Sequence, residues 1–321
     1  MNFWKKLKNK PFFCLAPMAD VTDVAFRAMF AKYGQPDVLW TEFVSADGLC
    51  SVGKKNLLHM LLFTKKEKPI VAQIFGAKPN NIREASALIA KMGFDGIDIN
   101  MGCPDKSVIK QGAGSALIKT PKLAREIIRA ALEGIKSAGK DIPVSVKTRI
   151  GFNKVELEDW ISELIQEDIS AITIHARTKK EMSDVPADWS QVKKVVDLVK
   201  KSGKEILVIG NGDVKSVADG KNKSLETKCD GIMVGRGAFG NPWFFNNEKK
   251  EISLEEKLKA LVEHIKLFEK YLKKDKSFAV MKKHFKSYVS GFDGAKELRV
   301  KLMETNSYLE AKKVISTYLS K

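Results

Sequence analysis

The chain has 321 residues, of which 44% are hydrophobic and 30% charged, a globular balance that excludes wholesale disorder and a fibrous repeat. The 56 Lys and Arg residues outnumber the 39 Asp and Glu residues, and the net charge of +17 indicates either a polyanionic partner or a lysine-rich proteome. No segment approaches the ~20 apolar residues of a membrane span, and Pro17 and Asp20 interrupt the short apolar run that would have to form a signal peptide. Four scattered cysteines without a CxxC pair favour a reducing cytoplasm.

Eight short apolar segments alternate with longer amphipathic segments along the first three quarters of the chain. The predicted strands are 12–16, 38–41, 70–74, 96–99, 144–148, 171–174, 206–209 and 231–234. Most of them lack polar alternation, as is typical of parallel strands that are buried on both faces. Helical spacing over 79–92, 121–138 and 156–166 predicts helices between them. We therefore expect an α/β protein with a (β/α)8 TIM barrel, and a doubly wound sheet is the alternative.

The pattern becomes purely helical after residue 245. Ser253 and Glu256 form a capping-box pattern, and further helices are predicted around 278–289, 295–304 and 308–319. We predict two domains, a barrel over 1–245 and a small helical domain over 246–321. The second holds 18 Lys and Arg against 11 Asp and Glu, about twice the net positive charge per residue of the first. It is therefore the better candidate for contacting a polyanion, with a solvated lysine-rich bundle as the alternative.

Polar or otherwise distinctive residues lie at or just beyond the end of nearly every predicted strand, where barrel enzymes place their active sites. They are Pro17–Ala19, Glu42, Gln73, Asn100 with Gly102–Pro104, Lys147 with Arg149, His175 with Arg177, Asn211–Asp213 and Gly235–Gly237. Packing gives no reason to gather amides and cations at one rim. The last two groups are glycine-rich turns that enter helices, and such turns bind phosphate through backbone N–H groups. We therefore expect a phosphate-bearing ligand, with Arg236 adding charge-assisted bonds.

Three single residues have several possible roles. Lys147 can form a Schiff base, stabilise negative charge on a cofactor ring, or pair with a carboxylate. His175 has no second histidine at ligand spacing, so a metal site is not expected, and it serves either the site or the core. Cys103, between Gly102 and Pro104, is a nucleophile, a proton donor or an incidental loop residue.

Several longer motifs occur together along the chain. They are 16–23 (APMADVTD), 73–76 (QIFG), 93–104 (GFDGIDINMGCP), 146–149 (VKTR), 175–178 (HART), 211–213 (NGD), 231–237 (GIMVGRG), 282–284 (KKH) and 294–299 (GAKELR). With these motifs the sequence resembles the bacterial tRNA-dihydrouridine synthases, which are flavin-dependent barrel enzymes. The resemblance covers nearly the whole chain. It departs from the family in two rim loops, at 105–108 after Cys103 and at 181–186 after Arg177.

The resemblance implies a cofactor, FMN, that is reduced by NADPH or NADH, a tRNA substrate, and a role for each matching residue. The implied FMN ligands are Pro17, Met18, Ala19, Gln73, Lys147 and His175 at the ring, and Asn211, Gly212, Asp213, Gly235 and Arg236 at the phosphate. Asn100 and Arg177 would face the uracil, and Cys103 would be the catalytic acid. No metal, membrane or obligate protein partner is implied.

The implied reaction is reduction of the C5=C6 bond of uridine to 5,6-dihydrouridine. Hydride from N5 of reduced FMN goes to C6, and a proton from Cys103 goes to C5. A thiol with an ordinary pKa near ~8.5 is mostly protonated at neutral pH and can donate. The uridine must leave its stack in the tRNA to reach the flavin.

Three other functions compete with this one. A flavin-dependent reductase of free pyrimidines would share the cofactor site, but it would not need the basic tail. A non-catalytic RNA-binding protein would not need Cys103 and Lys147. A Schiff-base lyase would use Lys147 without a flavin.

Overall fold

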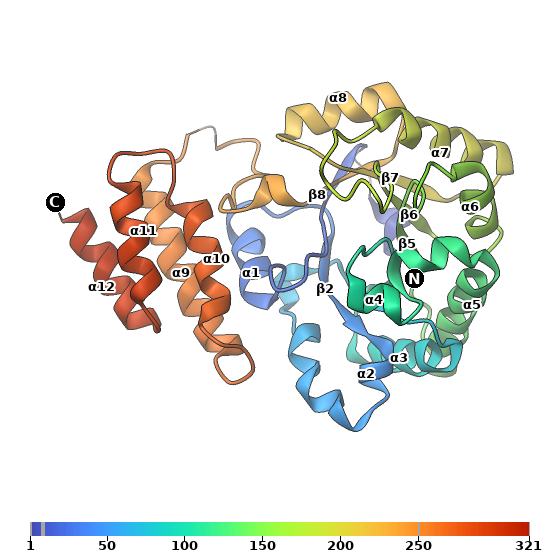
Figure 1. The fold of residues 1–321 in the computed structure, drawn as a ribbon, viewed down its shortest axis with the longest axis horizontal. Helices are drawn as coiled ribbons and strands as arrows, with labels where there is room; N and C mark the ends of the chain where they lie inside the picture. The colour runs from blue at the N-terminus through green and yellow to red at the C-terminus, as the bar shows by residue number, and fades with distance from the viewer. Residues whose placement is uncertain (1, 8–9, 250, 321) are drawn as a thin grey trace.

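The computed structural model describes residues 2–7, 10–249 and 251–320, and it contains a closed barrel of eight parallel strands (Figure 1). The strands follow the order β1-β8-β7-β6-β5-β4-β3-β2, and a parallel bridge between Cys14 and Val38 joins the two ends. They are β1 (Phe12–Leu15), β2 (Leu39–Ser45), β3 (Ile70–Phe75), β4 (Gly96–Met101), β5 (Val144–Arg149), β6 (Ala171–His175), β7 (Leu207–Asn211) and β8 (Gly231–Val234). The predicted (β/α)8 TIM barrel is confirmed, and closure rules out a doubly wound sheet.

Helices cover the outside of the barrel. They are α1 (Val24–Tyr33), α2 (Ala46–Leu49), α3 (Pro79–Met92), α4 (Lys106–Lys110), α5 (Pro121–Ser137), α6 (Leu157–Leu164), α7 (Trp189–Ser202) and α8 (Val217–Thr227). Both α3 and α5 begin at a proline, which suits the first turn of a helix. Gly93 ends α3 in the left-handed conformation, with φ of 87°. These local signals explain why the predicted bounds of α3 and α5 agree with the structure to within a residue.

The second strand differs from its prediction. β2 continues four residues past Thr41 and shifts register between Trp40 and Phe43, so Glu42 lies within the strand and not beyond it. Glu42 is fully buried and accepts a hydrogen bond of 2.6 Å from the backbone N–H of Asp20. The prediction ended the strand before Glu42, because a charged residue is unusual inside a buried strand. The cation that pairs with Glu42 comes from a distant part of the chain, so the sequence near Glu42 does not reveal it.

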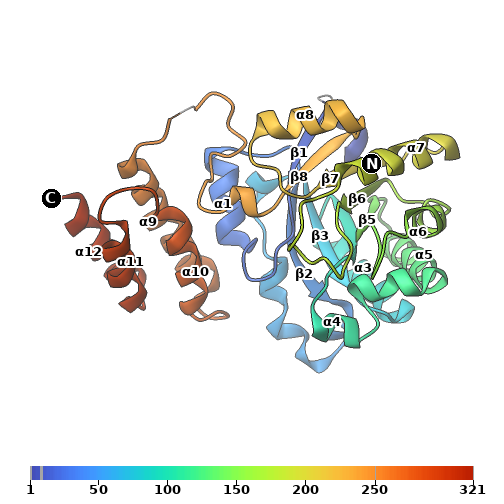
Figure 2. The ribbon, with the colours of Figure 1, turned by 45° about the horizontal axis from the view of Figure 1, so that its top comes forward.

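Four helices follow the barrel and lie beside α1 as a separate layer (Figures 1 and 2). They are α9 (Leu254–Leu272), α10 (Ala279–Tyr288), α11 (Ala295–Glu304) and α12 (Tyr308–Leu319). The predicted capping box of Ser253 and Glu256 opens α9. Their apolar faces form one hydrophobic cluster that also includes Val24 and Met29 of α1. The division at 245/246 stays a prediction. Within the described ranges, none of the helices combines the length and apolar character needed to span a membrane.

Candidate active site

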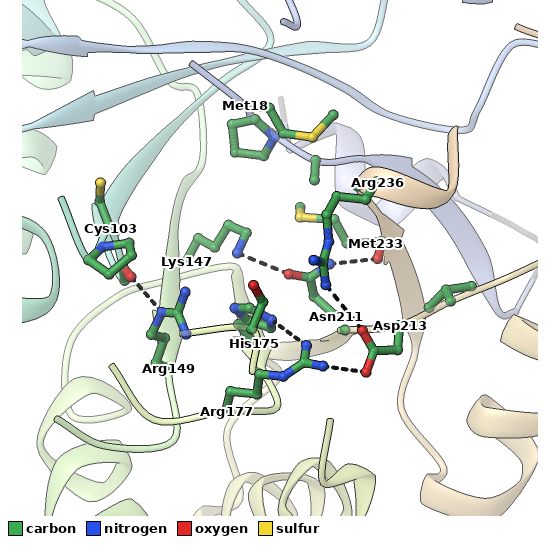
Figure 3. Close-up of a pocket in the computed structure, with 18 of the residues that line it drawn as sticks. Met18, Cys103, Lys147, Arg149, His175, Arg177, Asn211, Asp213, Met233 and Arg236 are labelled. Carbon is green, nitrogen blue, oxygen red and sulfur yellow. Dashed lines mark hydrogen bonds and ion pairs between the residues drawn. The ribbon is translucent and has the colours of Figure 1, made fainter. Parts of the chain in front are cut away.

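A cavity of about 730 Å³ opens at the carboxyl ends of the strands (Figure 3). Every predicted site residue except Ala19 lines it: Pro17, Met18, Gln73, Asn100, Cys103, Lys147, His175, Arg177, Asn211, Gly212, Asp213, Gly235 and Arg236. Its volume is in the ordinary range of small-molecule and cofactor sites. Residues that are up to 219 positions apart in the sequence, from Pro17 to Arg236, therefore share one hollow.

Strand register explains how these side chains meet. Asn100 on β4 pairs with Lys147 on β5, and His175 on β6 pairs with Asn211 on β7. Paired residues on neighbouring parallel strands point to the same side of the sheet. In a closed barrel the inward side at the carboxyl ends is the floor of the cavity, so the register alone brings these four groups together.

The cavity has a strong positive bias. Among the described residues that line it, the cations Lys147, Arg149, Arg177, Lys215 and Arg236 face a single carboxylate. That carboxylate, Asp213, forms ion pairs with Arg177 and, at 3.3 Å, with Arg236. The arrangement suits an anionic ligand.

Lys147 lies between the two ends of the cavity in Figure 3. Its Nζ donates one hydrogen bond of 3.1 Å, to Asn211 Oδ1. Burial first, and then the nearby Arg149, lower the pKa of Lys147 to about 8. A desolvated ammonium with one bonded N–H keeps donors for a ligand in the cavity.

His175 is electrically neutral in this setting. Burial, followed by the charges of Lys147 and Arg149, strongly lowers its pKa. Its Nε2 lies 3.4 Å from Arg177 Nη1. Across the described ranges there is no group of three or more His, Cys, Asp or Glu side chains that could hold a metal.

Cys103 lies on the loop after β4, and three backbone contacts hold that loop. Its N–H donates to Asn100 Oδ1 at 2.9 Å, and its carbonyl accepts from the Ser115 N–H at 3.1 Å. Arg149 Nε donates to the Gly102 carbonyl at 2.8 Å. Burial raises the pKa of the Cys103 thiol, and a hydrogen bond from the backbone N–H of Asp105 opposes the rise. The thiol therefore keeps its proton at neutral pH, which suits a donor and not a nucleophile.

The turns at Gly212 and Gly235 present backbone and not side chains to the cavity. Gly212 has φ of 132°, and a Cβ there would meet the Ala187 side chain at 2.7 Å. A Cβ on Gly235 would lie in ordinary contact with Met18 and Ala16, which also line the cavity. Backbone N–H groups at such turns can bind a phosphate.

Several lining residues were not assigned a site role from the sequence. They include Phe43, Arg149, Met182, Ser183 and Met233. Phe43 was hidden by the misplaced end of β2. Met233 is an apolar residue within a strand, which the sequence cannot distinguish from core. Met182 reaches the cavity from a loop, with φ of 51° at that residue. Of these residues, only Arg149 had a signal in the sequence, because it was already noted among the polar residues at the rim.

The closed barrel and the cationic cavity at the carboxyl ends of its strands are typical of a barrel enzyme and suit an anionic ligand. The family model described as dihydrouridine synthase (Dus) matches residues 14–321. The chain is 42% identical over 320 residues to a probable tRNA-dihydrouridine synthase of Staphylococcus aureus (strain MRSA252), covering 99% of this chain and 95% of that one. It is 41% identical to a probable tRNA-dihydrouridine synthase 2 of Bacillus subtilis (strain 168), covering 99% and 96%. The chain belongs to the dihydrouridine synthase family.

Solved structures share the fold at low sequence identity. Histamine dehydrogenase from Rhizobium sp. 4-9 has a TM-score of 0.52 at 13% identity, covering 80% of this chain and 49% of that one. A 2-naphthoyl-CoA reductase complex has a TM-score of 0.53 at 12% identity, covering 74% and 49%. This chain spans about half the length of each of them. At this identity the likeness shows a shared fold and nothing more.

Proposed function

We propose that this dihydrouridine synthase uses FMN and NADPH or NADH to reduce the C5=C6 bond of uridines in tRNA. The observation that carries the proposal is a half-buried cysteine, Cys103, that shares one cavity with a cluster of cations. A reduction of this kind needs a hydride source and a separate acid. Family membership implies the flavin, and the chain supplies the acid. We place the reaction in the cytoplasm, where tRNA is found.

The residues of the cavity fit FMN in two groups. Pro17, Met18 and Gln73 would contact the ring, with Lys147 and His175 at its polar edge. The turns at 211–213 and 235–236 would hold the phosphate, with Arg236 as its cation. When bound, FMN supplies the hydride that adds to C6 of uracil. Ala19 does not line the cavity, so we leave it out of this set.

Cys103 donates the proton to C5 in this proposal. The Sγ–H bond breaks as a C–H bond forms at C5, and the resulting thiolate takes a proton from water before the next turnover. Lys147 places a positive charge in the cavity, where it stabilises the negative charge of a reduced ring. In Figure 3, Cys103 and Arg236 lie on opposite sides of the cavity, with Lys147 between them. In this proposal, the uracil base lies between Cys103 and the residues around Arg236 that would hold the phosphate.

Asn100 and Arg177 are proposed to contact the uracil. Asn100 Nδ2 uses one N–H on Gln73 Oε1 at 2.9 Å and has one N–H left. Arg177 is more heavily engaged, since Nε donates to the Val185 carbonyl at 2.6 Å and Nη2 contacts Asp213. Arg177 therefore also anchors the atypical loop at 181–186.

The helices over 246–321 are proposed to hold the tRNA. They carry the higher density of positive charge and stand beside the barrel through α1. Contacts between Lys or Arg and phosphates bind a folded RNA without reading its sequence. Extrusion of the target base, at a cost of a few kcal/mol, then brings it to the cavity.

The test is mass spectrometry of tRNA that lacks dihydrouridine, after incubation with the protein, FMN and NADPH. A gain of two hydrogens at a mapped uridine is the expected result. A flavin-bound protein that oxidises NADPH without this gain would overturn the proposal. That result would assign the site to a free pyrimidine or another small acceptor.

A further inference from the structure

A carboxylate lies inside the barrel, next to the active-site residues but not among those that line the cavity. Asp98 on β4 is fully buried. It is paired in register with Gln73 on β3 and with Ser145 on β5. Its Oδ2 accepts from Gln73 Nε2 at 2.6 Å, and its Oδ1 accepts from Ser145 Oγ at 2.6 Å. These contacts tie it to a residue that does line the cavity.

A chain of hydrogen bonds continues from Gln73 to the loop after β4 that carries Cys103. Gln73 Oε1 accepts from Asn100 Nδ2 at 2.9 Å. Asn100 Oδ1 accepts from the backbone N–H of Cys103 at 2.9 Å and from that of Gly102 at 3.1 Å. We call Asp98, Gln73, Asn100 and the Cys103 N–H the relay.

The two ends of the relay fix its direction. An ionised carboxylate can only accept, and a backbone N–H can only donate. The two amides between them must therefore each turn their NH2 group toward Asp98 and their oxygen toward Cys103. Burial raises the pKa of Asp98 to about 6, while bonds from Ser145 and Gln73 oppose the rise. The group is thus mostly ionised at neutral pH.

We propose that Asp98 is a positioning residue, whose carboxylate orients the Gln73 and Asn100 amides and through them holds the backbone of Cys103. Both amides then keep one N–H that is not used in the relay, and both residues line the cavity. The relay therefore offers one N–H donor from each amide to the carbonyl oxygens of a bound flavin or uracil. This inference rests on the proposed function, in which Cys103 must be held beside C5.

Three substitutions separate the hydrogen bond from the charge. Asp98→Leu removes the acceptor and keeps the branching at Cγ, whereas Asp98→Asn keeps an oxygen for Gln73 Nε2 and loses the charge. Ser145→Ala removes the bond to the other carboxylate oxygen and leaves the relay intact. If Asp98→Leu does not fold, Asp98→Ser replaces it, because a serine hydroxyl is too short to reach Gln73.

Two measurements report on the loop and on each half of the reaction. Alkylation of Cys103 by iodoacetamide is read by mass spectrometry relative to Cys50, which is partly exposed and serves as the internal reference. Anaerobic stopped-flow absorbance follows flavin reduction by NADPH, and then flavin reoxidation by tRNA that lacks dihydrouridine.

For Asp98→Leu we expect the Cys103-to-Cys50 alkylation ratio to change about threefold or more. We expect reoxidation by tRNA to slow about tenfold or more, because misplacing a reacting group by an ångström has effects of this size. Flavin reduction should match that of Asp98→Asn, and both Asp98→Asn and Ser145→Ala should keep an alkylation ratio near the wild-type value.

If Asp98→Leu and Asp98→Asn change the alkylation ratio and slow the reaction with tRNA by the same amount, the loss of charge alone explains both effects. That result would overturn the relay. The same loss in Ser145→Ala would assign Asp98 to general barrel packing. If wild-type reduced flavin is not reoxidised by tRNA, the proposed function fails, and the alkylation ratios alone then decide whether the relay exists.

Discussion

A row of polar side chains buried in the barrel is hydrogen-bonded, whereas two histidines buried against the C-terminal helices are not. Asp98, Gln73 and Asn100 form a continuous set of hydrogen bonds across neighbouring strands. Between α1 and the C-terminal helices, His264 and His284 are also fully buried, with ring centroids 4.8 Å apart. Their four ring nitrogens have no hydrogen-bond partner in the part of the chain that the structure describes.

The difference follows from how each region is packed. Parallel strands in register place side chains opposite each other at fixed spacing, so polar groups can bond in rows. Helices meet through ridges and grooves, and here the two imidazoles pack against the Phe26 ring at 5.7 and 5.5 Å. An unpaired buried polar group costs roughly 1–3 kcal/mol. Hydrogen bonds thus orient the row of Asp98, Gln73 and Asn100 in the barrel, whereas the two histidines at the helical interface are buried at a cost in stability.

The largest expected effect comes from removing the thiol. Cys103→Ala should lower the rate of tRNA reduction about a thousandfold, within the range for loss of a general acid, while flavin absorbance of the purified protein is unchanged. Mass spectrometry of the tRNA gives the rate, and Cys50→Ala is the matched control. Loss of the flavin from Cys103→Ala would show a structural role instead.

The next effect concerns the ion pair that joins the two regions. Lys276, between α9 and α10, contacts both oxygens of Glu42 at 3.0 Å, and both side chains are buried. Lys276→Met should lower the free energy of unfolding by about 3 kcal/mol, because the buried Glu42 loses its cation. Urea unfolding measures this change.

A second ion pair across the same interface is the control for Lys276. Lys32 of α1 contacts Glu263 of α9 at 2.6 Å, but the Lys32 side chain is 56% exposed. Lys32→Met should cost less than about 1 kcal/mol. Adding Glu42→Gln to Lys276→Met should restore part of the loss, and equal costs for the two lysines would contradict the importance of burial.

Acid should change the stability contributed by the buried His264 and by the buried Asp98 in opposite directions. Burial lowers the pKa of His264 to about 3, below its unfolded value near ~6.5, so the unfolded chain binds more protons between these values and stability falls as pH falls. From pH 6.5 to 5 the loss is about 2 kcal/mol for this histidine. Asp98 has the reverse sign, because its folded pKa of about 6 lies above the unfolded one and protonation favours folding.

Replacing one ring isolates the histidine contribution. His264→Phe should reduce the acid-induced loss by about 2 kcal/mol over that interval, as measured by urea unfolding at several pH values. An unchanged pH slope would mean that the buried histidine does not resist protonation.

The smallest expected effect is an alkaline limb in the rate of flavin reduction. Because the pKa of Lys147 is lowered to about 8, its charge disappears as pH rises above that value. The rate should then fall about tenfold per pH unit if the ammonium is required. Lys147→Arg should shift this fall in rate to higher pH. If the fall stays at the same pH, another group causes it.

The sequence by itself determined the order of strands and helices and most of the residues that line the cavity. Buried strands without polar alternation, a proline at the start of α3 and α5, and the capping box at Ser253 are local signals, which act within a few residues. The polar residues at the ends of the strands were equally visible, since the barrel brings every carboxyl end to one rim.

Only the tertiary structure decided which partner each polar group meets. The burial of Glu42 depends on Lys276, which is 234 residues away, and the orientation of Asn100 depends on Asp98 through Gln73. The pKa of Cys103 and of Lys147 depends on burial that closure of the barrel creates. Register, closure and desolvation are collective properties of distant segments, so no local pattern in the sequence contains them.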